Sequence, residues 1–361
     1  MQDFLDDDFF LDFEEKAMKL RQRRLNEIKH RKIPAKRTLL NSLSTLTKER
    51  LDDIVYNLGI EEKVPGAKAA VAKMLEGKIQ LFFKGYVTSL ILDQKALFDH
   101  LAERGGITTE INVEDERLDI LVGLGILNCG KDKNGVQVYM PDEILAAYQE
   151  INNQEFDALV RQNDEVLRIA AGCTYFYGFI DYDSLYQKII ALVFDGEKKL
   201  EFIDFMGVML NGGTWIQGVY NDERGLCSQY LVELKDIVAA QEKFAQEISP
   251  DLAEFSYETL YDAGDKDYLH TSPEFQALSQ YLMQEYEHDI IAVGEDMKTC
   301  YALLQNFEEL DDIQETIEDQ FGEVKDGKQF AKLLQDYQKV IPQWRLNGHT
   351  LEEAKALKGK K

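Results

Sequence analysis

The chain has 361 residues, of which 45% are hydrophobic and 11% are aromatic, values that are ordinary for a globular protein. At about 150 residues per domain, this length predicts two or three domains. No apolar run approaches the ~18 residues that a membrane span requires, and the N-terminal sequence MQDFLDDDFF is acidic where a signal peptide is basic. Composition therefore excludes the membrane, fibrous and secreted disulfide-rich classes, and it predicts a cytoplasmic protein.

The net charge of −25 is distributed unevenly along the chain. Residues 1–15 carry seven acids and no base, whereas residues 16–37 carry ten bases and a single acid, Glu27. Residues 151–342 carry 38 acids against 14 bases, and the last 19 residues carry five bases against two acids. A basic arm and a small basic tail thus flank an acidic body, so a phosphate polyanion should be attracted mainly by the arm. The acidic body is either a solvated surface or one that binds a basic protein or mimics nucleic acid.

Cysteine and histidine spacing argues against bound metal. The four cysteines include no Cys-x-x-Cys pair and are expected to be free, buried thiols in a reducing compartment: Cys129, Cys173, Cys227 and Cys300. None of the five histidines lies four residues from another. Glycine-rich nucleotide loops and the Gly-x-Ser-x-Gly elbow of hydrolases are missing from the sequence. The sequence therefore predicts no cofactor, no metal site and no enzymatic activity.

Residues 1–42 form a charged N-terminal arm in this interpretation. Residues 14–32 are rich in helix formers, with a thin apolar stripe of Leu20, Leu25 and Ile28, and Pro34 should end the helix. The arm either contacts phosphate or is a solvated helix paired with the preceding acids. Its candidate nucleic-acid-binding residues are Arg21, Arg23, Arg24, Lys29, Arg31, Lys32, Lys36 and Arg37.

Residues 43–84 have the pattern of two helices joined by an extended loop. Thr47 begins the first helix, Gly59 ends it, and a second helix follows the loop sequence IEEKVPGAK. This pattern resembles the SAP domain and the N-terminal domain of the transcription terminator Rho. The resemblance implies nucleic-acid binding by basic residues around the loop and second helix, which here are Lys63, Lys68 and Lys73. The alternative is a small packing module without a ligand.

Residues 85–150 predict two helices and a β-hairpin near residues 126–140, with its turn at Asn134-Gly135. This order resembles a winged helix, whose last helix enters the major groove in DNA-reading members. Here that helix is acidic, because Glu114, Glu116 and Asp119 are among its charges. A helix with these charges is repelled by phosphates, so the resemblance favours a winged helix that faces protein. Lys131 and Lys133 in the hairpin are the basic exceptions.

Residues 151–342 predict an acidic helical domain, and residues 343–361 a C-terminal tail. The aromatic residues between Tyr175 and Tyr186 are expected in the core, because no base lies between Tyr175 and Tyr186, although Asp181 and Asp183 do. Gly178 should separate two helices, Asn221-Asp222 favours a short hairpin, and Ser249-Pro250 and Ser272-Pro273 predict helix starts. A helical hairpin is expected from residue 311 to 340.

Three segments of this region resemble a group of uncharacterised bacterial proteins, some of which continue into a cysteine-rich SEC-C zinc tail. They are Tyr-Phe-Tyr-Gly at 175–178, ISPDLAEFSYETLYDAG at 248–264, and Trp344, Gly348, His349 and Thr350 in the tail. The zinc-binding cysteines are not in this chain, so the resemblance implies no zinc. For His349, a packing or helix-capping role is favoured over a site role.

The sequence thus predicts a mainly α protein with a small helix–loop–helix, a winged-helix-like unit with one β-hairpin, and a larger acidic helical domain. Two functional hypotheses follow. The first is a non-enzymatic, cytoplasmic regulatory protein that binds DNA or RNA through the basic arm and the helix–loop–helix. The second is a protein–protein adaptor that uses the acidic winged-helix-like and helical domains and has no nucleic-acid role.

Overall fold

A computed structural model shows a mainly α protein with two small antiparallel sheets of three strands each, and this confirms the predicted fold class. The chain divides into two compact units, unit 1 (Met1–Arg161) and unit 2 (Gln162–Lys361). The finer division into five segments stays a prediction. The structure describes residues 7–194, 196, 199–216, 218–306, 310–322 and 324–359, with the side chains of 7–17, 311, 312, 320 and 321 excepted.

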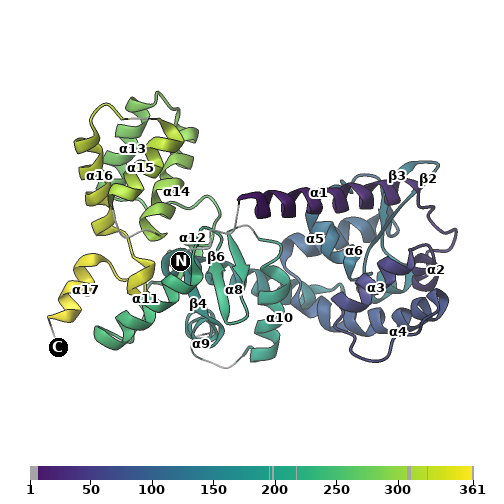
Figure 1. Ribbon diagram of the computed structural model, residues 1–361. Helices are drawn as coiled ribbons and strands as arrows, with labels where there is room; N and C mark the ends of the chain where they lie inside the picture. The colour runs from purple at the N-terminus through teal and green to yellow at the C-terminus, as the bar shows by residue number, and fades with distance from the viewer. Residues whose placement is uncertain are drawn as a thin grey trace. The chain divides into compact units, whose positions relative to one another are not determined.

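Unit 1 combines helices with one sheet (Figure 1). Its elements, in order, are α1 (Asp7–His30), α2 (Leu39–Ser44), α3 (Lys48–Asn57), α4 (Lys68–Tyr86), the 3-10 turn η1 (Val87–Ser89), α5 (Leu92–Glu103), β1 (Ile107–Thr108), α6 (Glu116–Gly123), β2 (Asn128–Asp132), β3 (Gly135–Tyr139) and α7 (Asp142–Ile151). Helix α8 (Gln154–Tyr177) begins in this unit and continues into the next.

The two helices predicted between residues 43 and 84 are present. The Thr47 hydroxyl caps α3 by accepting a hydrogen bond from the Arg50 amide at 3.2 Å, and Gly59 follows the helix with a φ of 61°. Leu51 and Ile54 on α3 are buried, as is Leu75 on α4, because apolar residues recur at helical spacing. Helix α4 runs on to Tyr86. The resemblance to SAP and Rho modules stays a prediction.

The sheet of unit 1 has the strand order β1-β3-β2. The predicted hairpin turn lies where expected, with Asp132 and Gly135 facing each other across it. The chain just after α1 extends this sheet, because Lys32 forms a parallel bridge with Lys131. The Lys131 amide donates to the Arg31 carbonyl at 2.7 Å. A side chain at Gly130 would press on this segment, since its Cβ would lie 3.0 Å from the Arg31 carbonyl oxygen.

Unit 2 contains the remaining helices and the second sheet. Its elements are β4 (Phe179–Asp181), α9 (Tyr182–Val193), α10 (Phe202–Gly212), β5 (Val219–Asn221), β6 (Gly225–Ser228), α11 (Leu234–Glu247), α12 (Tyr257–Ala263), α13 (Pro273–Glu285), α14 (Ile290–Asn306), α15 (Leu310–Phe321), α16 (Gly327–Val340), the 3-10 turn η2 (Trp344–Leu346) and α17 (Leu351–Lys358). The short hairpin expected at Asn221-Asp222 is present, and β4 pairs with β6 to complete the sheet.

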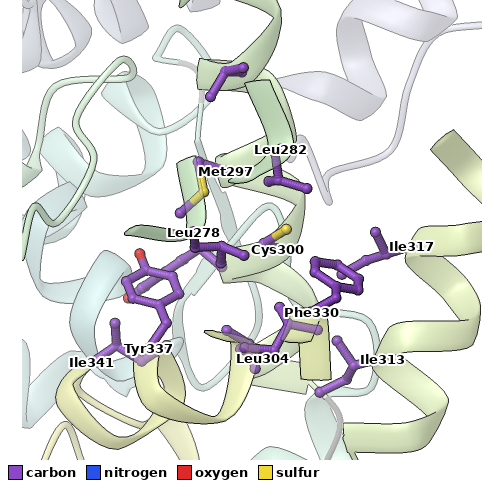
Figure 2. Packing of buried hydrophobic residues seen from close by; sticks show 13 residues of the cluster. Leu278, Leu282, Met297, Cys300, Leu304, Ile313, Ile317, Phe330, Tyr337 and Ile341 are labelled. Atoms are coloured by element: carbon purple, nitrogen blue, oxygen red, sulfur yellow. The ribbon is translucent and has the colours of Figure 1, made fainter. Parts of the chain in front are cut away.

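Helices α13 to α16 enclose one of the apolar cores of unit 2. Figure 2 shows side chains from all four helices, such as Leu278, Met297, Ile317 and Phe330, directed toward one another. Each of these four side chains is fully buried. The predicted helical hairpin is the α15–α16 pair, and Gly322 follows α15 with a φ of 104°. The apolar periodicity of this stretch was therefore sufficient to identify both helices.

The three segments at residues 175–178, 248–264 and 344–350 pack against one another. Trp344 lies against Gly178, and its indole N–H donates to the Tyr175 carbonyl at 2.8 Å. The Tyr177 hydroxyl donates to the Ala253 carbonyl at 2.6 Å. A Cβ at Gly348 would lie 2.7 Å from the Tyr177 ring. These contacts join the end of α8, the loop before α12 and the C-terminal tail into one part of the core.

Ser256, Ser272 and Thr350 cap three helices of unit 2, and one predicted helix start is misplaced. Ser272 caps α13 as expected, with Pro273 at the first helical position. The start predicted at Ser249-Pro250 is wrong, because α12 begins at Tyr257 and is capped by Ser256. Ser249 instead lies just beyond α11, where its amide donates to the Phe244 carbonyl at 3.1 Å. A Ser-Pro pair therefore marks a helix exit here.

We predict that Gly178→Ala destabilises unit 2 by about 2–5 kcal/mol. The residue has a φ of 70°, and an added Cβ would overlap the Trp344 ring, so backbone strain and overpacking both act. The two tryptophans of the chain, Trp215 and Trp344, both belong to unit 2, so urea unfolding followed by tryptophan fluorescence reports on this unit. Gly294→Ala is the control, because that helical position faces open space and alanine there should stabilise by up to ~1 kcal/mol. Equal midpoints for the two variants would contradict the prediction.

Candidate nucleic-acid interface

Helix α1 carries four of the eleven predicted nucleic-acid-binding residues, and it lies against α3, α6 and β2 of unit 1 (Figure 1). The predicted apolar stripe is only partly covered: Ile28 is buried, Leu25 is half-buried and Leu20 is 60% exposed. With so little apolar contact at its middle, α1 depends on its charged side chains for its position.

Two arginines of α1 pair with two carboxylates of α6 at matching spacing. Arg21 and Arg24 are three residues apart on α1, and their partners Glu116 and Asp119 are three residues apart on α6. The distance between Arg24 Nη1 and Asp119 Oδ1 is 2.7 Å, and Arg21 also donates to the Glu114 carbonyl. Residues three apart share a helix face, so two adjacent turns of each helix are joined. We call these two pairs the α1–α6 ion pairs.

The other arginines of the arm also make internal contacts. Arg23 pairs with Glu49 at the start of α3 at 3.2 Å, and Arg50 of α3 pairs with Glu27 of α1 at the same distance. Arg37 donates to the Gly105 carbonyl at 2.7 Å. Arg31 donates to the Cys129 carbonyl of β2 at 3.4 Å. All five predicted arginines therefore contribute to the packing of unit 1.

The Arg24–Asp119 ion pair is partly buried, and the loss of water shifts the pKa of both residues. Burial lowers the pKa of Arg24, although the charge of Asp119 raises it. Burial also raises the pKa of Asp119, although the charge of Arg24 lowers it. Two charges that lose water in this way are stable only while each has the other as a partner, so removal of either leaves a costly unpaired group.

The lysines of the arm behave differently from its arginines. Lys29, Lys32 and Lys36 are exposed, and none of the three forms an ion pair within the part of the chain that the structure describes. The bridge between Lys32 and Lys131 places these two side chains next to each other on the same face of the sheet. Lys133 follows Lys131 by two residues and is also exposed. We call Lys32, Lys131 and Lys133 the lysine row.

The three lysines predicted from the SAP-like pattern lie in the loop before α4 and on α4. Lys68 donates to the Ser44 carbonyl at 2.9 Å, and Lys73 pairs with Glu76. Lys63 is exposed in the loop and has no ion pair among the described residues.

The sequence prediction named neither the carboxylates that pair with the arginines nor the bridge to Lys131. The matched three-residue spacing on α1 and α6 was the signal that could have revealed the first of these.

Chemically reactive groups of unit 2 are largely buried. Burial raises the pKa of Cys173 to about 12, so its thiol is protonated at neutral pH. All four cysteines are free and buried, as predicted. Phe176, Tyr177 and Tyr186 are buried, as expected for core aromatics. His349 packs its ring 5.6 Å from that of Phe244, and the next residue, Thr350, caps α17.

Comparison with known proteins found no matching family model, no matching curated protein and no matching solved structure. Among the described helices, none combines the length and the apolar character needed to cross a bilayer.

We predict that Asp119→Lys loosens α1, because the variant removes the partner of Arg24 and adds a like charge. Amide hydrogen exchange in residues 21–30 should become several-fold faster, which corresponds to ~1 kcal/mol of local opening free energy. Adding Arg24→Asp to this variant should restore slow exchange, because the pair is then re-formed with the charges swapped.

Lys29→Glu is the matched control for this experiment. It also reverses one charge on α1, but Lys29 forms no ion pair with a described residue, so exchange in residues 21–28 should not become faster. If Asp119→Lys leaves the exchange of both helices unaltered, the α1–α6 ion pairs do not hold the arm.

Proposed function

We propose that this protein is a non-enzymatic regulatory protein that associates with nucleic acid, and that the lysine row is its contact with the phosphate backbone. The observation that carries the proposal is the bridge between Lys32 and Lys131. It places two exposed lysines from distant parts of the sequence at neighbouring backbone positions, with no carboxylate among the described residues paired to either. Like charges side by side on a sheet repel, and a polyanion that binds there removes this repulsion.

The mode of contact follows from the position of α6. In a DNA-reading winged helix the corresponding helix would face the bases, but here its acids pair with the arginines of α1. Base reading through α6 is therefore not part of the proposal. Lysine ammonium groups act on phosphate as point charges and carry little sequence information. The proposed binding is accordingly dependent on salt and tolerant of sequence.

We predict that Lys32→Ala together with Lys131→Ala weakens binding to random duplex DNA and single-stranded RNA. Each phosphate contact that is lost should lower the slope of log K against log salt by about 0.9 for duplex and about 0.7 for single strands. For the double variant, the slope should therefore be smaller in magnitude by about 1.8 for duplex DNA and by about 1.4 for single-stranded RNA. Fluorescence anisotropy over a salt series measures both slopes.

Lys84→Ala is the matched control, because Lys84 is an exposed lysine of unit 1 outside the lysine row. It should leave both slopes as in the unchanged protein. Charge reversal of Arg23, Arg24 and Arg31 is not a suitable test, since these arginines pack unit 1 and their loss would disturb the fold. Equal slopes for the double variant and the unchanged protein would refute the proposal and leave the lysines as protection of an exposed sheet edge.

A second candidate function, a protein–protein adaptor, is favoured by the charge and shape of unit 2. Residues 162–361 carry 18 bases against 38 acids, a net charge of −20. A cleft of ≈ 320 Å³ in this unit is lined by tyrosines such as Tyr230 and Tyr268 and by charges of both signs, since Lys298 pairs there with Asp267 and Glu295. Tyrosine rings accept cationic side chains on their faces, and the negative charge of the unit attracts such groups. The partner would be a lysine- or arginine-rich segment of another protein.

The adaptor function predicts that a lysine-rich peptide binds this cleft. Tyr230 is 40% exposed, so the Tyr230→Ala variant should fold normally. Its affinity for the peptide, measured by titration at moderate salt, should be several-fold lower. Tyr220→Ala, at a similarly exposed tyrosine outside the cleft, is the control. Equal peptide affinity for the two variants would contradict the assignment of the cleft.

A further inference from the structure

A cavity of ≈ 260 Å³ lies between α1, α3 and α6 of unit 1. Three arginines line it: Arg24 from α1, Arg31 just after α1, and Arg50 from α3. Tyr56, at the end of α3, lies at its edge and is 85% exposed. The Asn57 side chain donates to the Gly123 carbonyl at 2.9 Å and so connects α3 to α6 beside the cavity. We call this cavity the arginine pocket.

The guanidinium groups of the arginine pocket retain unused hydrogen-bond donors. Arg31 has a side chain that is only 9% exposed, yet its contacts are long: 3.4 Å to the Cys129 carbonyl and 3.9 Å to Glu27. Arg24 reaches Asp119 through one nitrogen, and Arg50 reaches Glu27 and Asp53 through two. Each guanidinium has five N–H donors, so the described contacts leave several of them without an acceptor.

The charges of the pocket are already balanced. Burial is the main cause that lowers the pKa of Arg24 and Arg31, and the charge of Arg50 lowers both further, so the three cations lie close enough to repel. Asp53 and Asp119 line the pocket, and Glu27 pairs with Arg31 and Arg50, so three carboxylates face the three guanidinium groups and an anion must bind through their remaining N–H donors. Arginine binds phosphate through paired N–H groups, and a phosphate monoester offers three acceptor oxygens with nearly two negative charges.

The exposed ring of Tyr56 adds a second requirement for the ligand. A large aromatic side chain that remains 85% exposed at the edge of an arginine-lined cavity offers a face on which a planar base can stack. We propose that the arginine pocket binds a phosphate monoester next to a nucleobase, as in a free 5′-mononucleotide or at the 5′-phosphorylated end of a nucleic-acid strand. This inference deepens the proposed function, but it concerns a different set of residues from the lysine row.

The test compares two oligonucleotides of one sequence, one with a 5′-phosphate and one with a 5′-hydroxyl, and also adenosine 5′-monophosphate. The 5′-phosphorylated strand should bind the full-length protein at least tenfold more tightly, because the 5′-hydroxyl strand lacks the terminal phosphate whose oxygens accept the charge-assisted hydrogen bonds. Tyr56→Ala should reduce this advantage about tenfold, and Tyr56→Phe should preserve it. Arg50→Lys keeps the charge but removes the planar fork, and it should also reduce the advantage.

A second readout does not depend on strand binding. The pocket is complete only when α1 lies on α3 and α6, so a bound mononucleotide should slow amide hydrogen exchange in residues 21–30. If the mononucleotide slows exchange but the 5′-phosphorylated and 5′-hydroxyl strands bind equally, the pocket is assigned to a free nucleotide. A strand preference assigns it to nucleic-acid ends.

The outcomes separate this inference from the proposed function. If both strands bind equally and the mononucleotide leaves exchange unchanged, the pocket inference is wrong, while binding through the lysine row stands. If the mononucleotide binds and neither strand does, the lysine-row proposal is wrong and the pocket inference stands. A 5′-phosphate advantage that survives both Tyr56→Ala and Arg50→Lys would also overturn the pocket inference.

Discussion

The ion pairs between α1 and α6 are the contacts on which the arrangement of unit 1 depends. Each helix alone has an unfavourable charge: Arg21 and Arg24 lie in a block of ten bases, and Glu116 and Asp119 lie in a cluster of acids. When the helices meet, each supplies the counter-charge of the other over two turns. The basic arm seen in the linear sequence is therefore largely neutralised in the fold, so its total charge overstates what a polyanion would encounter.

The division between arginines and lysines has a physical reason. A guanidinium is planar, weakly hydrated and has several donors in fixed directions, so it can reach a carboxylate and a backbone carbonyl at once, as Arg21 and Arg37 do. An ammonium is compact and strongly hydrated, and it is better kept in water unless an anion approaches. Lys29 and Lys32 follow this rule, because they remain exposed on a segment whose arginines are engaged. Between residues 21 and 37, the arginines therefore pack the fold, whereas Lys29, Lys32 and Lys36 remain in contact with solvent.

Local signals in the sequence were enough for most elements, and contacts between distant residues were not. Apolar periodicity and Thr47 identified α3, Asn134-Gly135 identified the β2–β3 turn, and the α15–α16 hairpin followed from spacing alone. The pairs Arg21–Glu116 and Lys32–Lys131 join residues about 95 to 99 positions apart, and no local pattern determines such a pairing. The candidate site changed for that reason: its residue types were predicted, but their partners were not.

The lysine row and the arginine pocket should respond differently to salt, and this follows from their burial. The lysines are exposed, so screening weakens their attraction to phosphate over a Debye length of about 10 Å at 0.1 M salt. The side chain of Arg31 is only 9% exposed, and interactions with partly buried charges are screened much less. At higher salt, the lysine contribution to strand binding should therefore fall first, and a pocket contribution should become the larger share. Because the pocket needs α1 in place, that share also depends on the α1–α6 ion pairs, whose partly buried Arg24–Asp119 contact resists the same screening.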